Sequence, residues 1–190
     1  MSVTRPGPRL VLVTGLQGTG KSTMADVAAA ELGAVVLGHD WAMSGLRPFP
    51  GVQAALDAMG GRGRGHRSVG WSILWALARA ELRRGRPVVL DGVARAPEVA
   101  GTRALAREEG VPSLIVLTEC SVAEVHRDRI EGRERGIPGW YELEWDHVAR
   151  ARSEWDPLDD VDVRLDAVAP LDDSVASLRG FLGRWCQGGT

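Results

Sequence analysis

Hydrophobic residues along the chain fall into short apolar runs separated by longer stretches with helical spacing. The runs lie within Leu10–Val13, Ala34–Leu37, Pro87–Asp91 and Leu114–Leu117. Such continuous runs are typical of strands that are buried on both faces of a parallel sheet. The more polar segment Val161–Leu165 predicts a modest edge strand.

Helical spacing fills most of the intervals between these strands. A glycine ends two of the helices, and a proline occupies the first turn of one. The predicted helices are Lys21–Leu32, Ser68–Arg84, Pro97–Glu109, Tyr141–Trp155 and Leu171–Trp185. A further helix follows Ser121, which has the spacing of a capping box with Glu124. Frequent glycine and proline predict irregular structure over residues 41–66.

Strands that alternate with helices predict a three-layer α/β/α fold around one parallel sheet with right-handed crossovers. The 190 residues fit a single domain, residues 1–190, which is long enough to bury a core without disulfides. One helix, Ser68–Arg84, shows a clear apolar face with two tryptophans on its flank. The face consists of Leu74, Leu77, Ala78 and Leu82, and the flanking residues are Trp71 and Trp75.

Composition narrows the range of partners and compartments. The net charge of −2 offers no overall basic surface for nucleic acid or an anionic membrane. No apolar run reaches the roughly 18 residues of a membrane span, and Met1–Pro6 lacks the apolar region of a signal peptide. Cys120 and Cys186 form no disulfide framework, so we expect reduced thiols in the cytoplasm. The acidic residues between Asp156 and Asp162 are expected to form a solvated loop.

Residues Gly15–Ser22 match the pattern G-x-x-x-x-G-K-[ST] in full, and the only lysine of the chain occupies the required position. The motif follows an apolar strand and opens a helix, which is the context that supports it. Glycines allow backbone N–H groups to point inward as an anion nest, to which the helix N-terminus adds positive potential. The sequence therefore predicts a site for the phosphates of a nucleoside triphosphate.

Particular side chains of the motif have separate expected roles. Lys21 reaches the β- and γ-phosphates, the Ser22 hydroxyl binds Mg²⁺, and Thr23 supports the α-phosphate. The residues expected to bind the nucleotide are Gly15, Gln17, Gly18, Thr19, Gly20, Lys21, Ser22 and Thr23.

Beyond this motif, the chain resembles the P-loop kinases of the nucleoside-monophosphate-kinase type. The third strand continues as Asp91-Gly92-Val93-Ala94-Arg95, where adenylate kinases carry Asp-Gly-aromatic-Pro-Arg. This resemblance implies that Asp91 holds a Mg²⁺-bound water and that Arg95 touches phosphate. Val93 and Ala94 depart from the adenylate-kinase pattern and weaken the match to nucleotide acceptors.

Residues Arg129–Arg135 resemble the Arg-x-x-Gly-Arg-Arg entry to a kinase lid. The resemblance implies an arginine-rich lid over about residues 127–140, in which Arg129 and Arg133 contact the nucleotide. The planar fork and permanent charge of arginine suit the stabilisation of a transferring phosphoryl group. The alternative is an exposed helix with Arg–Glu pairs. In the kinases that this segment resembles, an arginine of the next helix, here Arg150 or Arg152, also returns to the phosphates.

The second strand ends in Gly38-His39-Asp40, which looks more like small-molecule kinases such as chloramphenicol phosphotransferase and the zeta-toxin group. In those kinases an aspartate faces the acceptor hydroxyl, and an aspartate so placed can take the hydroxyl proton. Asp40 is therefore the expected base, with a helix N-cap as its alternative role. We expect the acceptor between Asp40, Arg95 and the helix that carries Trp71.

Together these resemblances imply five parallel strands in the order 2-3-1-4-5 and a Mg²⁺-dependent transfer of the γ-phosphoryl group of ATP to a hydroxyl of a small molecule. A nucleoside monophosphate or a polynucleotide 5′ end is an alternative acceptor, which Asp40 and the overall acidity disfavour. An ATP-binding module that switches a partner interaction is an alternative of another class. The sequence leaves open the acceptor's identity, the choice between ATP and GTP, and the oligomeric state.

Overall fold

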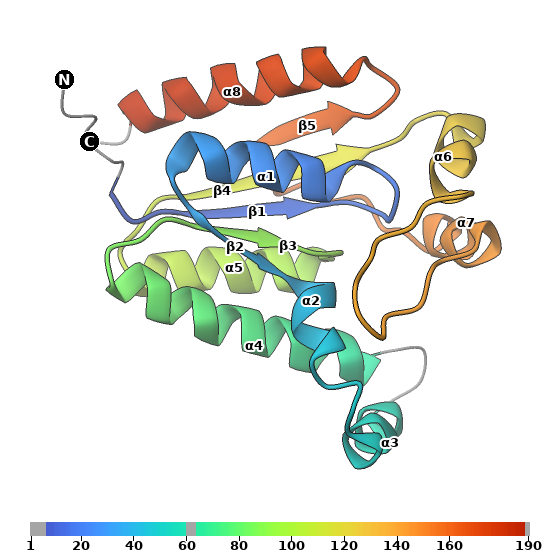
Figure 1. Ribbon diagram of the computed structural model, residues 1–190. Coiled ribbons are helices and arrows are strands. Elements are labelled where there is room, and N and C mark those ends of the chain that lie inside the picture. The colour runs from blue at the N-terminus through green and yellow to red at the C-terminus, as the bar shows by residue number, and fades with distance from the viewer. Residues whose placement is uncertain (1–6, 60–63, 189–190) are drawn as a thin grey trace.

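A five-stranded parallel sheet forms the centre of the computed structural model, which describes residues 7–59 and 64–188 (Figure 1). The strands are β1 (Leu10–Thr14), β2 (Val35–Gly38), β3 (Val88–Asp91), β4 (Ser113–Glu119) and β5 (Val163–Asp166). Their order is β2-β3-β1-β4-β5, and every neighbouring pair is parallel. The predicted sheet and strand order are therefore confirmed.

Helices cover both faces of this sheet and extend past the carboxyl ends of its strands (Figure 1). They are α1 (Lys21–Leu32), α2 (His39–Ser44), α3 (Pro50–Ala58), α4 (Arg64–Arg83), α5 (Ala96–Glu108), α6 (Ala123–Ile130), α7 (Trp145–Ser153) and α8 (Leu171–Gly188). The α1 and α8 helices lie on one face and α4 and α5 on the other. No helix in the described ranges is both long and apolar enough to cross a membrane.

Strand β1 joins the two apolar layers of the core. Successive side chains of a strand point to opposite faces, so its residues divide between the layers. Leu10 and Leu12 pack with α4 and α5, whereas Val11 and Val13 pack with α1 and α8. All four side chains are fully buried. This double burial explains why the strand appears in the sequence as an unbroken apolar run.

The prediction of irregular structure over residues 41–66 is wrong for most of that segment. It contains most of α2, all of α3 and the first residues of α4, while residues 60–63 lie outside the described part. Proline at the start of α3 suits a helix N-terminus, where its missing N–H costs nothing. Gly65 lies in α4, where a Cβ would lie 2.1 Å from the carbonyl oxygen of Leu56. Close packing, which the sequence pattern does not reveal, selects this glycine.

Two further helix predictions need correction. The Ser121–Glu124 capping box is absent, because α6 begins after Val122 without a side-chain cap. The backbone of Ser121 is engaged elsewhere: its N–H donates to Asp166 and its carbonyl accepts from Arg152. The helix predicted from Tyr141 begins only at Trp145.

The buried face of α4 is rotated from the predicted one. Trp71 is 1% exposed and packs in the core with Leu74, whereas Leu77 is 47% exposed. The apolar stripe therefore follows positions 71, 74, 78 and 82, and Leu77 lies beside it rather than on it. The ring of Trp71 fills space beneath Gly92, where a Cβ would lie 3.0 Å from the indole.

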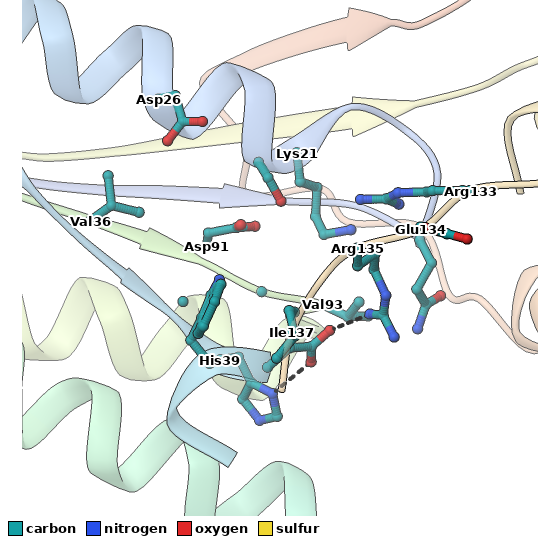
Figure 2. A pocket seen from close by; sticks show the side chains of 16 residues that line it. Lys21, Asp26, Val36, His39, Asp91, Val93, Arg133, Glu134, Arg135 and Ile137 are labelled. Carbon is teal, nitrogen blue, oxygen red and sulfur yellow. Dashed lines mark hydrogen bonds and ion pairs between the residues drawn. The ribbon is translucent and has the colours of Figure 1, made fainter. Parts of the chain in front are cut away.

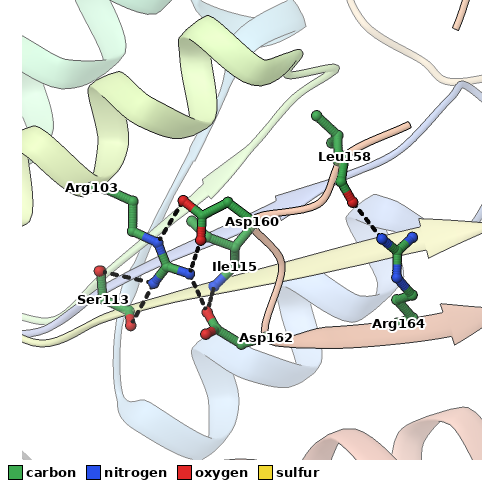
Figure 3. Close-up of polar contacts among 7 residues, drawn as sticks. All are labelled: Arg103, Ser113, Ile115, Leu158, Asp160, Asp162 and Arg164. Atoms are coloured by element: carbon green, nitrogen blue, oxygen red, sulfur yellow. Dashed lines mark hydrogen bonds and ion pairs between the residues drawn. The ribbon is translucent and has the colours of Figure 1, made fainter. Parts of the chain in front are cut away.

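The acidic residues between α7 and β5 are exposed, as the sequence predicts for a solvated loop, and two of them also pair with α5 (Figure 3). Arg103 of α5 pairs with Asp160 at 3.0 Å and with Asp162 at 2.9 Å. Asp162 also accepts a hydrogen bond of 2.7 Å from the backbone N–H of Ile115 in β4. These contacts fix the chain as it enters the edge strand β5.

Candidate active site

A cavity of about 500 Å³ opens at the carboxyl ends of β1, β2 and β3 (Figure 2). Ligands of open parallel sheets bind at this end of the strands. Figure 2 shows Lys21, Asp91 and Arg133 directed into the same space from three different segments. The cavity is lined by Gln17, Lys21, Ser22, Asp26, Val36, Gly38, His39, Asp40, Trp41, Asp91, Gly92, Val93, Arg133, Glu134, Arg135 and Ile137.

The loop between β1 and α1 has the backbone conformation of an anion nest. Gly15, Gly18 and Gly20 have φ values of 141°, 82° and 86°, a region that favours glycine. Space is equally restrictive, because a Cβ on Gly15 would lie 1.9 Å from the carbonyl oxygen of Thr118. Conformation therefore favours glycine at all three positions, and packing also requires it at Gly15.

Lys21 and Ser22 begin α1 and meet Asp91 at the end of β3. The Lys21 ammonium donates to the carbonyl of Leu16 at 2.8 Å, so it lies against the loop. Burial lowers the pKa of Lys21, although Asp91 and Asp40 oppose this effect. Burial raises the pKa of Asp91, against the charge of Lys21 and a hydrogen bond from Ser22.

The paired oxygens of Ser22 and Asp91 fit the preferences of Mg²⁺. This hard ion takes oxygen ligands and is usually held by one or two carboxylates together with substrate phosphates. A hydroxyl and a carboxylate in hydrogen-bond contact supply such a partial set. Within residues 7–59 and 64–188, no three His, Cys, Asp or Glu side chains gather into a metal site. A divalent ion bound to these two oxygens would take its other ligands from water or from substrate phosphates.

Asp40 lies in the first turn of α2 and is half-buried at the cavity wall. Its Oδ2 accepts from Arg135 at 2.7 Å, and its Oδ1 lies 3.5 Å from Nδ1 of His39. Burial by itself would raise the pKa of Asp40. The hydrogen bond and charge of His39, together with Arg135 and Lys21, outweigh this effect, so the pKa of Asp40 lies below its usual value. Asp40 is not the N-cap of its helix, which is Gly38.

Arg135, which sequence reasoning left out of the site, is the most enclosed charge of the α6–α7 loop. Its side chain is only 9% exposed and also pairs with Glu142 at 3.2 Å. The same guanidinium donates to the carbonyl of Tyr141. The arginine-rich segment was the available signal, but spacing alone did not indicate which arginine turns inward.

The structure brings only some of the predicted residues together. Arg133 lines the cavity, whereas Arg129 and Arg95 do not. Arg129 donates instead to the carbonyl of Ala167 at 2.6 Å. Arg95 donates to the carbonyl of Glu154 at 3.5 Å. Thr23 is exposed on α1, and the buried Thr19 hydroxyl bonds to Leu16 at 2.7 Å.

Trp71, which was expected to contact the acceptor, lies in the core and not on the cavity wall. Of the two arginines left open in α7, Arg152 is engaged by backbone: it donates to the carbonyls of Cys120 at 2.6 Å and Ser121 at 3.0 Å. It lines a second, smaller hollow together with Gly15 and Leu16 of the phosphate loop.

Known structures resemble this fold over nearly its whole length. The protein APE1195 superposes with a TM-score of 0.70 at 24% identity, covering 96% of this chain and 98% of that one. A gluconokinase from Sinorhizobium meliloti 1021 gives 0.66 at 19% identity, covering 96% and 95%. The Mycobacterium tuberculosis APS kinase CysC, solved with AMPPNP and APS, gives 0.63 at 20% identity, covering 95% and 99%. At these identities the likeness establishes the P-loop α/β fold.

Sequence comparison identifies the family. No curated protein is significantly similar to the chain. A family model described as an AAA domain, AAA_33, matches residues 10–154, which include the phosphate loop, the β3 carboxylate and the arginine-rich loop. The match spans most of the chain, and the protein belongs to the AAA_33 family of AAA domains.

Proposed function

We propose that the protein is a kinase that transfers the γ-phosphoryl group of ATP to a hydroxyl group of a small molecule. The observation that carries this proposal is the arrangement of Lys21 and Asp40 in one cavity. Both side chains line the cavity, so the proposed phosphate-binding group and the proposed hydroxyl-binding group face a common space. The resemblance in fold to a gluconokinase and an APS kinase supports the same class of reaction.

The phosphate loop is the proposed binding site of the ATP phosphates. Its amides bind the β-phosphate, and Lys21 moves from the carbonyl of Leu16 to the β- and γ-phosphates. Ser22 and Asp91 would hold Mg²⁺, and the bound ion would neutralise charge on the transferred group. Arg133 extends from the α6–α7 loop toward the same region and compensates the charge that spreads over the equatorial oxygens.

Asp40 is the proposed base at the acceptor end. The hydroxyl oxygen forms a bond to the γ-phosphorus as the bond to the β–γ bridging oxygen breaks, and ADP leaves. The hydroxyl proton passes to a carboxylate oxygen of Asp40. A loose transition state needs little prior deprotonation, so a carboxylate with a low pKa can orient the hydroxyl and accept its proton late.

Transfer of labelled γ-phosphate from Mg²⁺–ATP into a fractionated metabolite pool tests this function. We expect a labelled small product with the wild-type chain and none with Lys21→Ala. Label found only in nucleoside diphosphates or polynucleotide ends would contradict the proposed acceptor class. Tight ATP binding without any transfer would overturn the kinase assignment.

The Asp40→Asn variant tests the base. Asparagine keeps the size of the side chain but cannot take a proton, so we expect transfer to fall by about 10²–10⁴-fold. ATP affinity, measured by equilibrium binding, should stay within about threefold of wild type because Asp40 lies on α2 and not in the phosphate loop. Unchanged transfer in this variant would exclude Asp40 as the base.

A further inference from the structure

His126 is a fully buried polar side chain that the proposed mechanism does not use. It lies on α6, and its Nε2 is 2.6 Å from the backbone carbonyl oxygen of Gln17 in the phosphate loop. Gly18, the next residue of the loop, packs directly under the same helix: a Cβ there would lie 2.7 Å from Ile130 and 3.3 Å from His126. The helix that leads into the arginine-rich loop therefore rests on the phosphate-binding backbone.

The protonated nitrogen of His126 follows from its second contact. Arg152 of α7 approaches Nδ1 at 3.2 Å, and a guanidinium N–H only donates. Nδ1 is thus the acceptor, which leaves the proton on Nε2, where it is donated to the Gln17 carbonyl. Trp145 packs edge-on against the imidazole, with the ring centroids 5.5 Å apart. One neutral imidazole consequently joins the loop to α6 and α7, which lie side by side in Figure 1.

The carbonyl that His126 holds belongs to the peptide group that carries the N–H of Gly18. A trans peptide is planar, and its C=O and N–H point in opposite directions. Fixing the Gln17 carbonyl toward His126 therefore fixes the Gly18 N–H away from it. The Gly18 N–H therefore points away from α6, and the amides of a phosphate loop are the groups that bind the anion.

We propose that His126 is a positioning residue that orients the Gly18 amide for the phosphates of ATP. It also joins α6 and α7 to the phosphate loop when ATP is bound there. This role rests on the proposed nucleotide site. It acts on nucleotide affinity whatever the acceptor, because the peptide group lies in the phosphate loop and not at Asp40.

Direct binding of Mg²⁺–ATP to His126→Phe and His126→Gln tests the role. Phenylalanine keeps the ring but donates nothing, and we expect its Kd for ATP to rise at least about tenfold, as for one oriented hydrogen bond lost. Glutamine carries an N–H donor at a similar reach, so we expect its Kd within about threefold of wild type. His147→Phe, the same change at an exposed position of α7, is the matched control and should bind as wild type.

The pH dependence of binding gives a readout that packing alone would not change. Burial, with the charges of Arg152, Lys21 and Arg129, holds the pKa of His126 below its usual value despite the hydrogen bond to Gln17. Protonation at acid pH would place an N–H against Arg152. We therefore expect the wild-type chain to lose ATP affinity more steeply than His126→Gln as the pH falls below the usual histidine pKa.

The outcomes separate this inference from the proposed function. Failure of the wild-type chain to bind ATP overturns the nucleotide site itself. Wild-type affinity in His126→Phe, or an equal loss in both variants, overturns the positioning role and leaves the kinase proposal intact. Thermal unfolding of each variant identifies any loss of fold, and the glutamine variant with its pH profile then provides the test.

Discussion

At the residue scale, Arg135 helps His39 to keep low the pKa of Asp40, the carboxylate that the proposed transfer uses. It is nearly buried and lies between Asp40 and Glu142, on a loop far from Asp40 in sequence. A charge in such surroundings acts strongly on its neighbours because little water screens it. Arg135 thus counteracts the effect of burial on Asp40, which by itself would favour the protonated acid.

Replacement of Arg135 by methionine should shift the pH dependence of transfer. The folded-state pKa of Asp40 lies below its ordinary value, so the carboxylate stays charged until the pH falls through that lowered pKa. Without Arg135 the pKa rises, and the acidic fall in activity should move to higher pH. Initial rates of phosphoryl transfer across pH measure this shift. Arg127→Met, which removes an exposed arginine paired with Glu131, is the control; equal profiles for both variants would contradict the role.

At the element scale, α4 shows how tertiary packing overrides helix propensity. This helix contains glycines in its interior, which weaken an isolated helix. Gly70 is nevertheless required, because a Cβ would lie 2.3 Å from Nε2 of His39. The close approach of α4 to the end of β2 thus supports the turn that presents Asp40.

Two glycine-to-alanine changes separate packing from propensity. Gly183→Ala in α8 adds a Cβ with no neighbour within 4 Å, and should stabilise the fold by about 0.5–1 kcal/mol. Gly70→Ala gains the same propensity but displaces His39, and should destabilise by about 1–3 kcal/mol. Urea unfolding midpoints measure both changes. A stabilised Gly70→Ala variant would show that His39 can move aside to make room for the added methyl group.

At the scale of the whole molecule, the candidate site and the Arg103 network lie at opposite ends of the sheet. The cavity lies at the carboxyl ends of the strands, whereas Arg103 contacts Ser113, the first residue of β4. Its aspartate partners precede β5. We infer that this network stabilises the edge of the sheet without contributing to ligand binding.

Arg103→Ala should therefore separate stability from function. The change removes the ion pairs with Asp160 and Asp162, and Asp162 keeps its hydrogen bond from the Ile115 N–H. We therefore expect the free energy of unfolding to fall by about 1–3 kcal/mol. The Kd for Mg²⁺–ATP should not change while the protein remains folded. Urea denaturation and equilibrium binding on the same preparation check the two expectations. A weakened affinity at low denaturant would show that the two ends are coupled.

The sequence by itself determined the features that depend on neighbouring residues. Strands buried on both faces must be apolar throughout, so Leu10–Val13 and Leu114–Leu117 could be recognised without a structure. The phosphate loop could be recognised because its glycines, lysine and serine are contiguous, and the φ values of Gly15, Gly18 and Gly20 agree with that interpretation.

Only the tertiary structure decided which distant side chains meet. Arg135 and Asp40 are 95 positions apart, and His126 and Gln17 are 109 apart, so no local pattern relates them. The same applies to Trp71, whose burial beneath Gly92 depends on how α4 packs against the β3–α5 turn. Periodicity fixes which residues share a face of a helix, but the angle at which that helix packs decides which of them reach the cavity.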